Sequence, residues 1–477
     1  MKTAQMAPLS PGATNLATLD RDAETTRKTL FVMIAVAWTL LFGLEALFAM
    51  TAHADDRSAK NADTGPSPTL VAPKKQAIPK VNVAKAIGWQ GESQPTTTQG
   101  FVVNAYATEL QHPRWLYVLP NGDILVAETN APERKDENKG VRGWFMKQAM
   151  KDAGAGVPSA NRITLLRDAD KDGVAETRTA FLSGLTSPFG MALVGNTLYV
   201  ANTDAIVKFQ YTPGATEIKG QGEKVADLPA GTRNHHWTKN IIASADGTKL
   251  YATVGSNSNV AEHGMEQEVN RAAILEVDVQ TGKTRVFASG IRNPNGLAWQ
   301  PASRLLWTAV NERDEIGDDL VPDYMTSVRD GEFFGWPYSY YGANIDERVE
   351  KRDNALIAKA RKPDYALGSH TASLGLVFYP LDGTAFPDRY RGGAFVGQHG
   401  SWNRGEFAGY KVIFVPFDAA GKPAGPIEEF LTGFLDKEGQ AMGRPVGVAV
   451  DRSGALLVAD DVGNRIWRIV ATTKTKT

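Results

Sequence analysis

The stretch WLYVLPNGDILVAETN at residues 115–130 decides the fold, because it joins two apolar strands through an Asn-Gly turn and ends in polar residues. The same pattern returns in five further copies, which begin at Phe189, Thr238, Gly296, Leu374 and Val446. Strands rich in β-branched and aromatic residues, separated by Gly, Asn and Asp, are typical of antiparallel hairpins. Hairpins repeated at such intervals indicate the blades of a propeller. The sequence therefore predicts an all-β protein, a six-bladed β-propeller.

The repeat also predicts where polar residues gather. In an antiparallel hairpin, the residues that enter the first strand and those that leave the second lie at the same end of the sheet. If the first strands line the central channel, both sets meet at one rim. The entering residues are His112, Arg114, His235, His236, Arg292, Asn293, His370 and Arg444; the leaving residues are Glu128, Asn202, Asp204, Asn311, Glu312, Gln398, His399, Asp460 and Asp461. Such a mouth is predicted to bind something small, polar and anionic.

Composition narrows the class of protein. The chain has 477 residues, with 46 Gly and 25 Pro, which suits a turn-rich all-β domain with a large core. The net charge of −1 gives no general attraction to nucleic acid, so no nucleic-acid partner is expected. The absence of cysteine excludes disulfides, thiolate metal sites and thiol catalysis.

The N-terminal region carries an export pattern. Residues 1–28 form a cytoplasmic extension that ends in Arg27 and Lys28, and TLFVMIAVAWTLLFGL follows at residues 29–44. Ala52-His53-Ala54 then offers a small-residue cleavage site. Residues 29–54 are thus predicted to be a signal peptide or a signal anchor, with the rest of the chain in the periplasm. The protein is either soluble after cleavage or held in the inner membrane by residues 29–50, and the short apolar run leaves both alternatives open.

The remaining boundaries follow from composition. Residues 55–100 are rich in Pro, Lys, Thr and Ala and are predicted to be a flexible linker. The propeller is predicted over residues 101–471, with residues 472–477 as a tail. The segment GFVVNAYATEL at residues 100–110 is expected to complete the last blade beside NRIWRIV at residues 464–470, because closing the ring removes exposed sheet edges.

Two insertions follow the second strand of a blade, at Ala131–Asn161 and at Arg313 to about Trp336. The first contains the helical stretch VRGWFMKQAMKDAG, and the second contains DEIGDDLVPDYM and GEFFGWP. By strand parity both should emerge at the polar rim. We expect the two insertions to form the sides of the mouth or to cover it. The alternative is that they are surface loops without a role at the mouth.

An acidic turn has the pattern of a metal loop. In Asp168-Ala169-Asp170-Lys171-Asp172-Gly173 the alternate aspartates direct hard oxygens to one point, and Glu176 adds a further ligand. The flanking stretches resemble strands, and parity places the turn on the face away from the rim. The interpretation is a structural calcium site, with a solvated acidic turn as the alternative.

Two rim stretches carry candidate chemistry. His235 and His236 open the third blade, where a neutral imidazole beside Arg can accept a proton. Arg292 and Asn293 open the fourth blade, and a cluster of carboxylates from Glu312 to Asp319 leaves it. Cation, amide and hard oxygens in one quadrant favour a divalent metal beside an anionic ligand. A hydrogen-bonded core histidine and a salt-bridged loop remain the alternatives.

Several motifs in order resemble one family. RNPNGLAW (292–299), NERDEIGDDL (311–320), GEFFGWP (331–337), HTASLGLVFYP (370–380), FVGQHGSWNRGEFAGYK (395–411) and GRPVGVAVD (443–451) are similar to the glucose/sorbosone dehydrogenases, closer to the sorbosone-type branch. The resemblance spans about residues 101–470. It implies a periplasmic six-bladed propeller that uses pyrroloquinoline quinone (PQQ) and calcium to oxidise an aldose or a sorbosone-like aldehyde.

The resemblance also implies roles for single residues. His236 matches the general base, Arg292 the arginine near the C5 oxygen of the quinone, and Asn293 its partner. The backbone carbonyls of Arg313 and Asp314 match those that hold the calcium at the quinone. Arg444 matches a quinone-carboxylate arginine. Val446 stands where glucose-oxidising members have a second Arg, so Arg404, Lys239 and Arg114 are the predicted substitutes.

The implied reaction is hydride transfer from a sugar or aldehyde to the quinone, followed by electron transfer to a downstream quinone or cytochrome. Two other functions stay open. One is a metal-dependent, lactonase-like hydrolase, and the other is a propeller that only binds a ligand.

Overall fold

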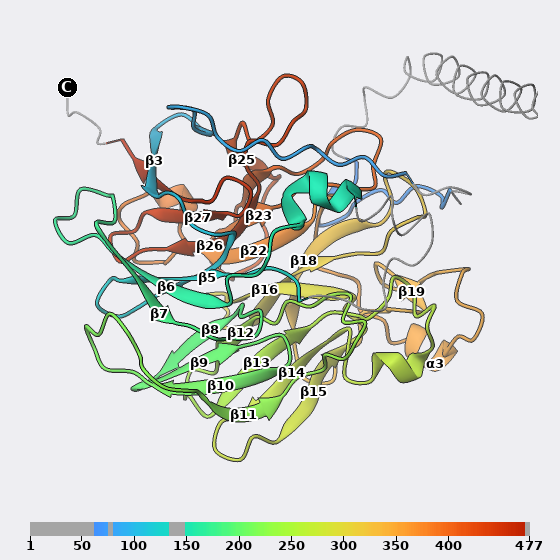
Figure 1. The fold of residues 1–477 in the computed structure, drawn as a ribbon. Helices are drawn as coiled ribbons and strands as arrows, with labels where there is room; N and C mark the ends of the chain where they lie inside the picture. The colour runs from blue at the N-terminus through green and yellow to red at the C-terminus, as the bar shows by residue number, and fades with distance from the viewer. Residues whose placement is uncertain (1–61, 75–79, 133–147, 473–477) are drawn as a thin grey trace, which may run out of the picture. The chain divides into compact units, whose positions relative to one another are not determined.

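The computed structural model describes residues 62–74, 80–132 and 148–472 (Figure 1). The predicted extension, the apolar segment at residues 29–54 and the tail from residue 473 onward lie outside these ranges. Within them, no helix is long and apolar enough to cross a membrane. In these described ranges, helical structure is limited to short pieces such as η2 (Lys151–Ala155), η3 (Met265–Glu268), α3 (Asn354–Ile357) and η4 (Asp388–Tyr390).

The first three blades are four-stranded antiparallel sheets. Blade 1 is β4 (Pro113–Val118), β5 (Ile124–Glu128), β6 (Arg162–Arg167) and β7 (Thr177–Leu182). Blade 2 is β8 (Met191–Val194), β9 (Thr197–Ala201), β10 (Ala205–Gln210) and β11 (Glu223–Asp227). Blade 3 is β12 (Ile241–Ala243), β13 (Lys249–Val254), β14 (Ala273–Asp278) and β15 (Thr284–Ser289).

The last three blades each recruit a strand from the N-terminal part of the chain. Blade 4 is β16 (Asn293–Trp299), β17 (Leu306–Asn311), β18 (Pro322–Val328) and β21 (Tyr365–Ser369), extended by β1 (Thr64–Gly65). Blade 5 is β22 (Ser373–Phe378), β23 (Ala394–Gln398), β24 (Lys411–Val415) and β25 (Glu428–Thr432), extended by β2 (Thr96–Thr97). Blade 6 is β26 (Pro445–Val450), β27 (Leu456–Asp460), β28 (Arg465–Ala471) and β3 (Phe101–Ala107). A two-stranded ribbon of β19 (Ser339–Tyr340) and β20 (Asn344–Ile345) lies in the blade 4 connection.

The six first strands form the inner ring, since β4, β8, β12, β16, β22 and β26 contact one another in that order and β26 returns to β4. Glycine makes this close approach possible. A Cβ at Gly375 would lie 2.2 Å from the carbonyl oxygen of Val446, and one at Gly447 would lie 2.7 Å from that of Arg114. Neighbouring inner strands therefore pack backbone to backbone at the glycines of the repeat.

The ring closes as predicted, because β3 pairs with β28 and Phe101 lies opposite Ala471. The parity prediction is also confirmed. Pro113 pairs with Glu128 and Asn293 pairs with Asn311, so entering and leaving residues share one end of each blade. We call this end the rim and the opposite end the far face.

Two predictions about segments were wrong. The predicted linker is not a free spacer where the structure describes it, because Thr64 pairs with Leu367, Thr96 pairs with Thr432, and Trp89 is buried. Backbone hydrogen bonds and one aromatic anchor hold this segment, and neither leaves a periodic pattern. The second predicted insertion was too long, because its residues 322–328 form β18, the third strand of blade 4.

Candidate functional site

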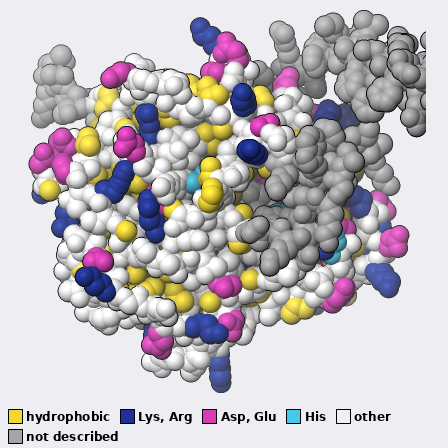
Figure 2. Space-filling view, viewed as in Figure 1, with side chains coloured by type: hydrophobic (Ala, Val, Ile, Leu, Met, Phe, Trp, Pro, Cys, Tyr) yellow, Lys and Arg dark blue, Asp and Glu magenta, His cyan; other side chains and the backbone are white. Residues whose placement is uncertain are grey.

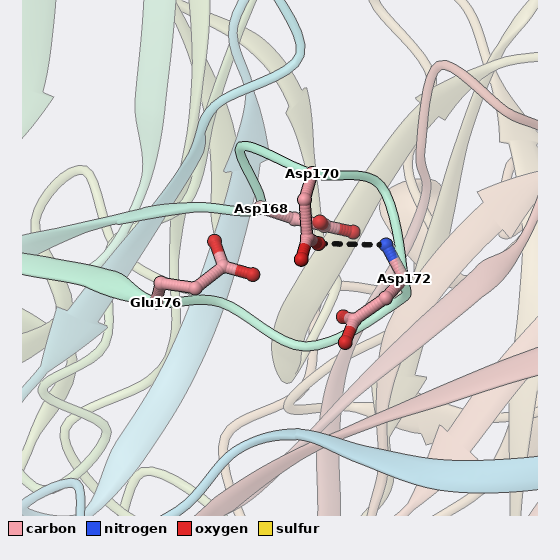
Figure 3. Close-up of side chains that lie close together, drawn as sticks. All are labelled: Asp168, Asp170, Asp172 and Glu176. Carbon is pink, nitrogen blue, oxygen red and sulfur yellow. Dashed lines mark hydrogen bonds between the residues drawn. The ribbon is translucent and has the colours of Figure 1, made fainter.

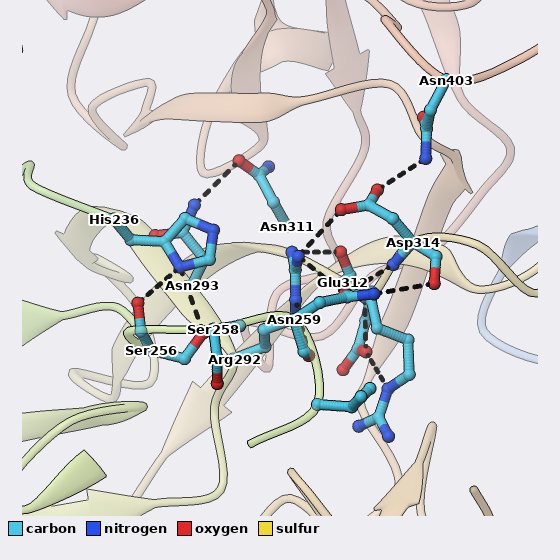
Figure 4. Close-up of polar contacts among 12 residues, drawn as sticks. His236, Ser256, Ser258, Asn259, Arg292, Asn293, Asn311, Glu312, Asp314 and Asn403 are labelled. Atoms are coloured by element: carbon cyan, nitrogen blue, oxygen red, sulfur yellow. Dashed lines mark hydrogen bonds and ion pairs between the residues drawn. The ribbon is translucent and has the colours of Figure 1, made fainter. Parts of the chain in front are cut away.

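His236 lies at the rim just before β12, beside the entry of β16. Its Nδ1 lies 2.8 Å from the carbonyl oxygen of Ser256, which can only accept a hydrogen bond (Figure 4). The proton is thereby assigned to Nδ1, and Nε2 becomes the accepting nitrogen. A Cβ at Gly255 would lie 2.5 Å from Cβ of His236 and 2.4 Å from Oδ1 of Asn293, so the absent side chain lets these two residues come together.

Arg292 is held by four contacts to two loops, one that follows β13 and one that follows β17. Its guanidinium donates to Oδ1 and the backbone oxygen of Asn259, to the carbonyl of Glu312 at 2.5 Å, and to Asp314 at 2.8 Å (Figure 4). Burial alone would raise the pKa of Asp314, but Arg292 and then His370 lower it to about 2. The result is a buried, fixed arginine in blade 4, close to the predicted base.

Amides connect this cluster to the neighbouring blades. Asn293 donates to Asn311, and Asn311 donates to the carbonyl of Ser373 at 2.7 Å. Asn403 in blade 5 donates to the second oxygen of Asp314 at 2.8 Å. The Oδ1 atoms of Asn293 and Asn403 are buried without a hydrogen-bond partner among the described residues, so polar atoms at the mouth remain available to a ligand.

The other half of the rim is built around Asp461. Arg114 donates to its carboxylate at 2.8 Å, Nε2 of His399 lies at 2.9 Å, and Nε2 of His112 lies at 3.5 Å. Burial lowers the pKa of His112 to about 4 and lowers that of His399 too, so both imidazoles are neutral near pH 7 and Arg114 balances the carboxylate. The Arg114 guanidinium also lies over the Trp237 ring, which links blade 1 to blade 3.

Arg444 lies beside this cluster in blade 6. Its guanidinium donates to the hydroxyl of Tyr410 at 3.1 Å and to the carbonyl of Ala84 at 3.4 Å, while its Nε is buried without a partner among the described residues. Burial lowers the pKa of Arg114 and His399, and nearby Arg444 lowers both further. Arg114 is thus paired with Asp461, whereas the described hydrogen-bond partners of the Arg444 guanidinium are both neutral.

Three of the predicted cofactor and metal residues have side chains that are bonded to other groups of the protein. Lys239 is buried, and its ammonium donates to the carbonyls of His236 and Trp237; burial lowers its pKa well below the usual range. It therefore supports the backbone beneath the histidines and does not face a ligand. Arg404 pairs with Asp319 at 2.7 Å, which balances its charge. The Arg313 side chain is fully buried, with ion pairs to carboxylates of Glu312 and Asp346.

Several leaving residues have a structural role that the sequence did not reveal. Their side chains accept hydrogen bonds from the backbone N–H groups that lead into the first strand of the same blade: Glu128 from Gln111, Asn202 from Thr186, and Asp460 from Arg444. Gln398 is buried and donates to the carbonyl of Leu367, whereas Asp204 is exposed. These residues order the rim and do not form one catalytic cluster.

The acidic turn lies between β6 and β7 on the far face, as parity predicted (Figure 3). Ligand atoms of Asp168, Asp170, Asp172 and Glu176 lie within 4.8 Å of one another. Among the described residues this is the only group of three or more acidic or histidine side chains close enough to hold a metal ion. Calcium binding at this turn stays a prediction.

Sequence reasoning missed Asn259, Asn403, Ser256, Tyr410 and the N-terminal segment that reaches Arg444. The amides and Ser256 lie in loops outside the repeat and gave no signal. A lone Trp89 in an otherwise polar stretch was the available clue for the N-terminal segment. The surface in Figure 2 shows Lys, Arg, Asp and Glu interspersed, with no broad patch of one charge on that face.

The geometry defines a six-bladed propeller with a polar, arginine-rich mouth. The TrAA12-like family model matches residues 95–331 and 326–472, and the chain belongs to this family. A protein of Borreliella burgdorferi with no assigned function is 31% identical over 300 residues, which cover 60% of this chain and 76% of that protein. The PQQ-dependent pyranose dehydrogenase of Coprinopsis cinerea is 25% identical over 335 residues, 58% of this chain and 44% of that protein, so the chain matches less than half of its length.

Solved structures agree on the fold. The PQQ domain of the Coprinopsis cinerea pyranose dehydrogenase, in its holo form, superimposes with a TM-score of 0.61 at 20% identity, covering 82% of this chain and 100% of that one. The Trichoderma reesei enzyme of carbohydrate-active family AA12 gives a TM-score of 0.63 at 17% identity, with 82% and 99% coverage.

Proposed function

We propose that the protein is a quinoprotein dehydrogenase that oxidises a sugar, either an aldose or a sorbosone-like aldehyde, with PQQ as the electron acceptor. The observation that carries the proposal is the bond from Nδ1 of His236 to the Ser256 carbonyl, which leaves Nε2 to take a proton, beside the fixed Arg292. Family membership and the similarity to the PQQ-dependent pyranose dehydrogenase of Coprinopsis cinerea support the same class of reaction.

The residues at the mouth fit PQQ. The cofactor supplies a two-electron acceptor when bound, and its carboxylates need cations. Arg114 and Arg444 are such cations on one side of the mouth, and Asn293 adds a buried amide oxygen without a partner among the described residues. Hydrogen-bonding capacity left unused in a buried site favours a bound polar ligand.

We assign the residue roles accordingly. Nε2 of His236 takes the proton of the substrate hydroxyl or aldehyde hydrate. Arg292 stabilises negative charge that develops beside it, and its four contacts keep it from moving during the reaction. Asp314 holds Arg292, and Asn403 holds Asp314, so neighbouring blades fix the arginine.

A calcium ion at the cofactor is part of the proposal, with one restriction. The carbonyl oxygen of Asp314 accepts hydrogen bonds from Asn259 at 3.1 Å and from Arg348 at 2.8 Å. Calcium at that oxygen would compete with both donors, so the Arg313 carbonyl is the stronger of the two predicted ligands. The acidic turn on the far face is proposed as a separate, structural calcium site.

The hydrolase alternative has less support. A metal-dependent hydrolase needs several side-chain ligands converging at the mouth. Among the described residues, the acidic turn on the far face is the one group of three or more acidic or histidine side chains whose ligand atoms all lie within 4.8 Å of one another. At the rim, Asp314 and Asp461 instead contact arginines.

Reconstitution tests the proposal. Purified protein would be supplied with PQQ and calcium, separately and together, and dye reduction followed with a panel of aldoses and sugar aldehydes. We expect activity only when both are present. PQQ binding without turnover on any substrate would leave a binding role, and EDTA-sensitive ester hydrolysis without PQQ would support the hydrolase.

We further propose that the protein is exported, with the periplasm as its location and a quinone or cytochrome as its electron acceptor. The proposal depends on the apolar segment at residues 29–54. Fractionation of cells with an antibody to the propeller domain would separate a cleaved soluble form from an anchored one.

A further inference from the structure

The described N-terminal residues 80–100, here called the strap, cross the rim before the chain enters β3. Figure 1 shows the strap in blue running past the blades that contain β22 to β28. Asn82 takes part in hydrogen bonds with Trp402, Arg404 and Gly405 of blade 5, Ala86 donates to Asp152 of the first insertion, and Ile87 donates to Ala441 before blade 6. The strap is therefore bonded to three separate loops of the rim.

Trp89 anchors the strap on a buried carboxylate. Its indole N–H donates to Oδ2 of Asp460 at 2.6 Å, and its ring packs edge-on against Phe434 and Trp467. The other oxygen of Asp460 accepts the backbone N–H of Arg444 at 2.8 Å. One carboxylate thus joins the strap to the backbone of the mouth arginine.

The strap also touches the arginine side chain. The carbonyl of Ala84, which is buried, accepts from the Arg444 guanidinium, and the guanidinium lies 5.0 Å from the centre of the Tyr410 ring. Ala84 and Tyr410 offer neutral groups, so neither balances the charge of Arg444. A buried cation held by neutral partners is suited to an incoming anion.

We propose that the strap is a positioning element of the ligand site, in which Trp89 and Ala84 hold Arg444 ready for a carboxylate of the bound ligand. The inference depends on the proposed function, since PQQ is the tricarboxylate in question. Trp89 acts through Asp460 and Arg444 and contacts no ligand itself. Without the strap, the Arg444 guanidinium loses the Ala84 carbonyl as a hydrogen-bond acceptor and loses the strap residues that cover it. The arginine can then leave its buried position.

The test uses two matched variants. Trp89→Phe removes the strap's N–H donor to Asp460 and keeps an aromatic ring. Trp467→Phe removes a second indole donor to the same oxygen, at 3.0 Å, from within blade 6. Thermal melting of both apoproteins shows the general loss of stability, and the Kd for PQQ is measured by titration without turnover.

We expect Trp89→Phe to raise the Kd for PQQ about tenfold. Trp467→Phe should lower Tm by a similar amount but change the Kd for PQQ little. In an Arg444→Gln background, Trp89→Phe should add nothing further. Phenylglyoxal modification mapped by mass spectrometry gives a readout that needs no cofactor. Arg444 should be protected in the wild type and in Trp467→Phe and should react in Trp89→Phe.

Equal protection of Arg444 in the wild type and in Trp89→Phe would overturn the proposal, and so would an unchanged Kd after Arg444 becomes reactive. A wild type that binds no PQQ overturns the proposed function, and Arg444 modification then decides the role of the strap. If Trp89→Phe does not fold, Asn82→Ala replaces it, because this change removes only side-chain bonds to Arg404 and Gly405.

Discussion

Carboxylates gather at both ends of the blades, but in opposite electrostatic settings. At the rim, Asp314 and Asp461 are buried or nearly so, and each contacts an arginine at 2.8 Å. In the acidic turn, Asp170 and Asp172 are exposed, and their side chains accept hydrogen bonds from backbone N–H groups of the same turn. Because the rim carboxylates are already paired with arginines of the protein, they need no cation from solution. The turn has to take its cation from solution.

The largest expected effect concerns the rim, where we place the catalytic reaction. His236→Gln should lower turnover by roughly two to four orders of magnitude, because a general base is lost while the PQQ site is kept. Single-turnover quinone reduction at saturating PQQ measures it. His235→Gln is the control and should lower turnover much less. A larger loss of turnover in His235→Gln than in His236→Gln would show that the two histidines were assigned wrongly.

A smaller loss of turnover is expected when the contacts that fix Arg292 are weakened. Arg292→Lys keeps the charge but cannot reproduce contacts to Asn259, Glu312 and Asp314 together. We expect turnover to fall by about tenfold to a hundredfold, with the Kd for PQQ changed less. Arg361→Lys, on an outer edge of blade 4, is a control for arginine loss. Equal effects at both positions would contradict the assignment.

Asp460 is a third buried carboxylate near the rim, and it differs from Asp314 and Asp461 in having no arginine side chain bonded to it among the described residues. Its four described donors are all uncharged N–H groups. Burial raises its pKa to about 6, above the value of about 4 in an unfolded chain. The folded state thus keeps a proton between about pH 4 and 6 that the unfolded state releases, and this stabilising contribution is lost as the pH rises.

The Asp460→Asn variant lacks this titration. We expect the free energy of unfolding of the wild type, relative to the variant, to fall by on the order of 1–3 kcal/mol between pH 4 and pH 7. Urea unfolding at several pH values measures the difference. Parallel curves for the two proteins would show that Asp460 does not titrate in this window.

The smallest expected effect concerns the acidic turn. Asp170→Ala should lower Tm by a few degrees in millimolar calcium and leave Tm unchanged in EDTA, because only the folded turn collects the ligands. Turnover of the folded enzyme should not change, since the turn lies on the far face. Loss of turnover with unchanged melting would contradict that placement.

The fold could be predicted because each blade repeats one hairpin, and the glycines of the repeat mark where inner strands touch. His236, Arg292 and Asn293 could be placed at one mouth because each stands at a strand entry. Lys239 also stands just before the first strand of a blade, yet its side chain turns beneath the backbone and donates to the His236 carbonyl. Strand parity gives the end of a blade but not the direction of a long side chain.

The strap could not be predicted from periodicity, because backbone groups make most of its described bonds. Its composition of mostly polar and small residues resembles a spacer, and most of its partners lie more than 300 residues away in sequence, as Asn82 and Arg404 show. Long-range pairing of this kind depends on the surfaces of finished blades, and a local pattern does not report it.

Ring closure has a consequence for biosynthesis. β3 is among the earliest strands to be made, yet it pairs with β28, which ends at Ala471. The ribosome must therefore finish all six blades before the ring can close, and contacts of such high sequence separation form slowly. An open propeller with an unpaired β3 exposes a sheet edge until then. Until the ring closes, this edge is a place where the newly made chain can pair with another chain and aggregate.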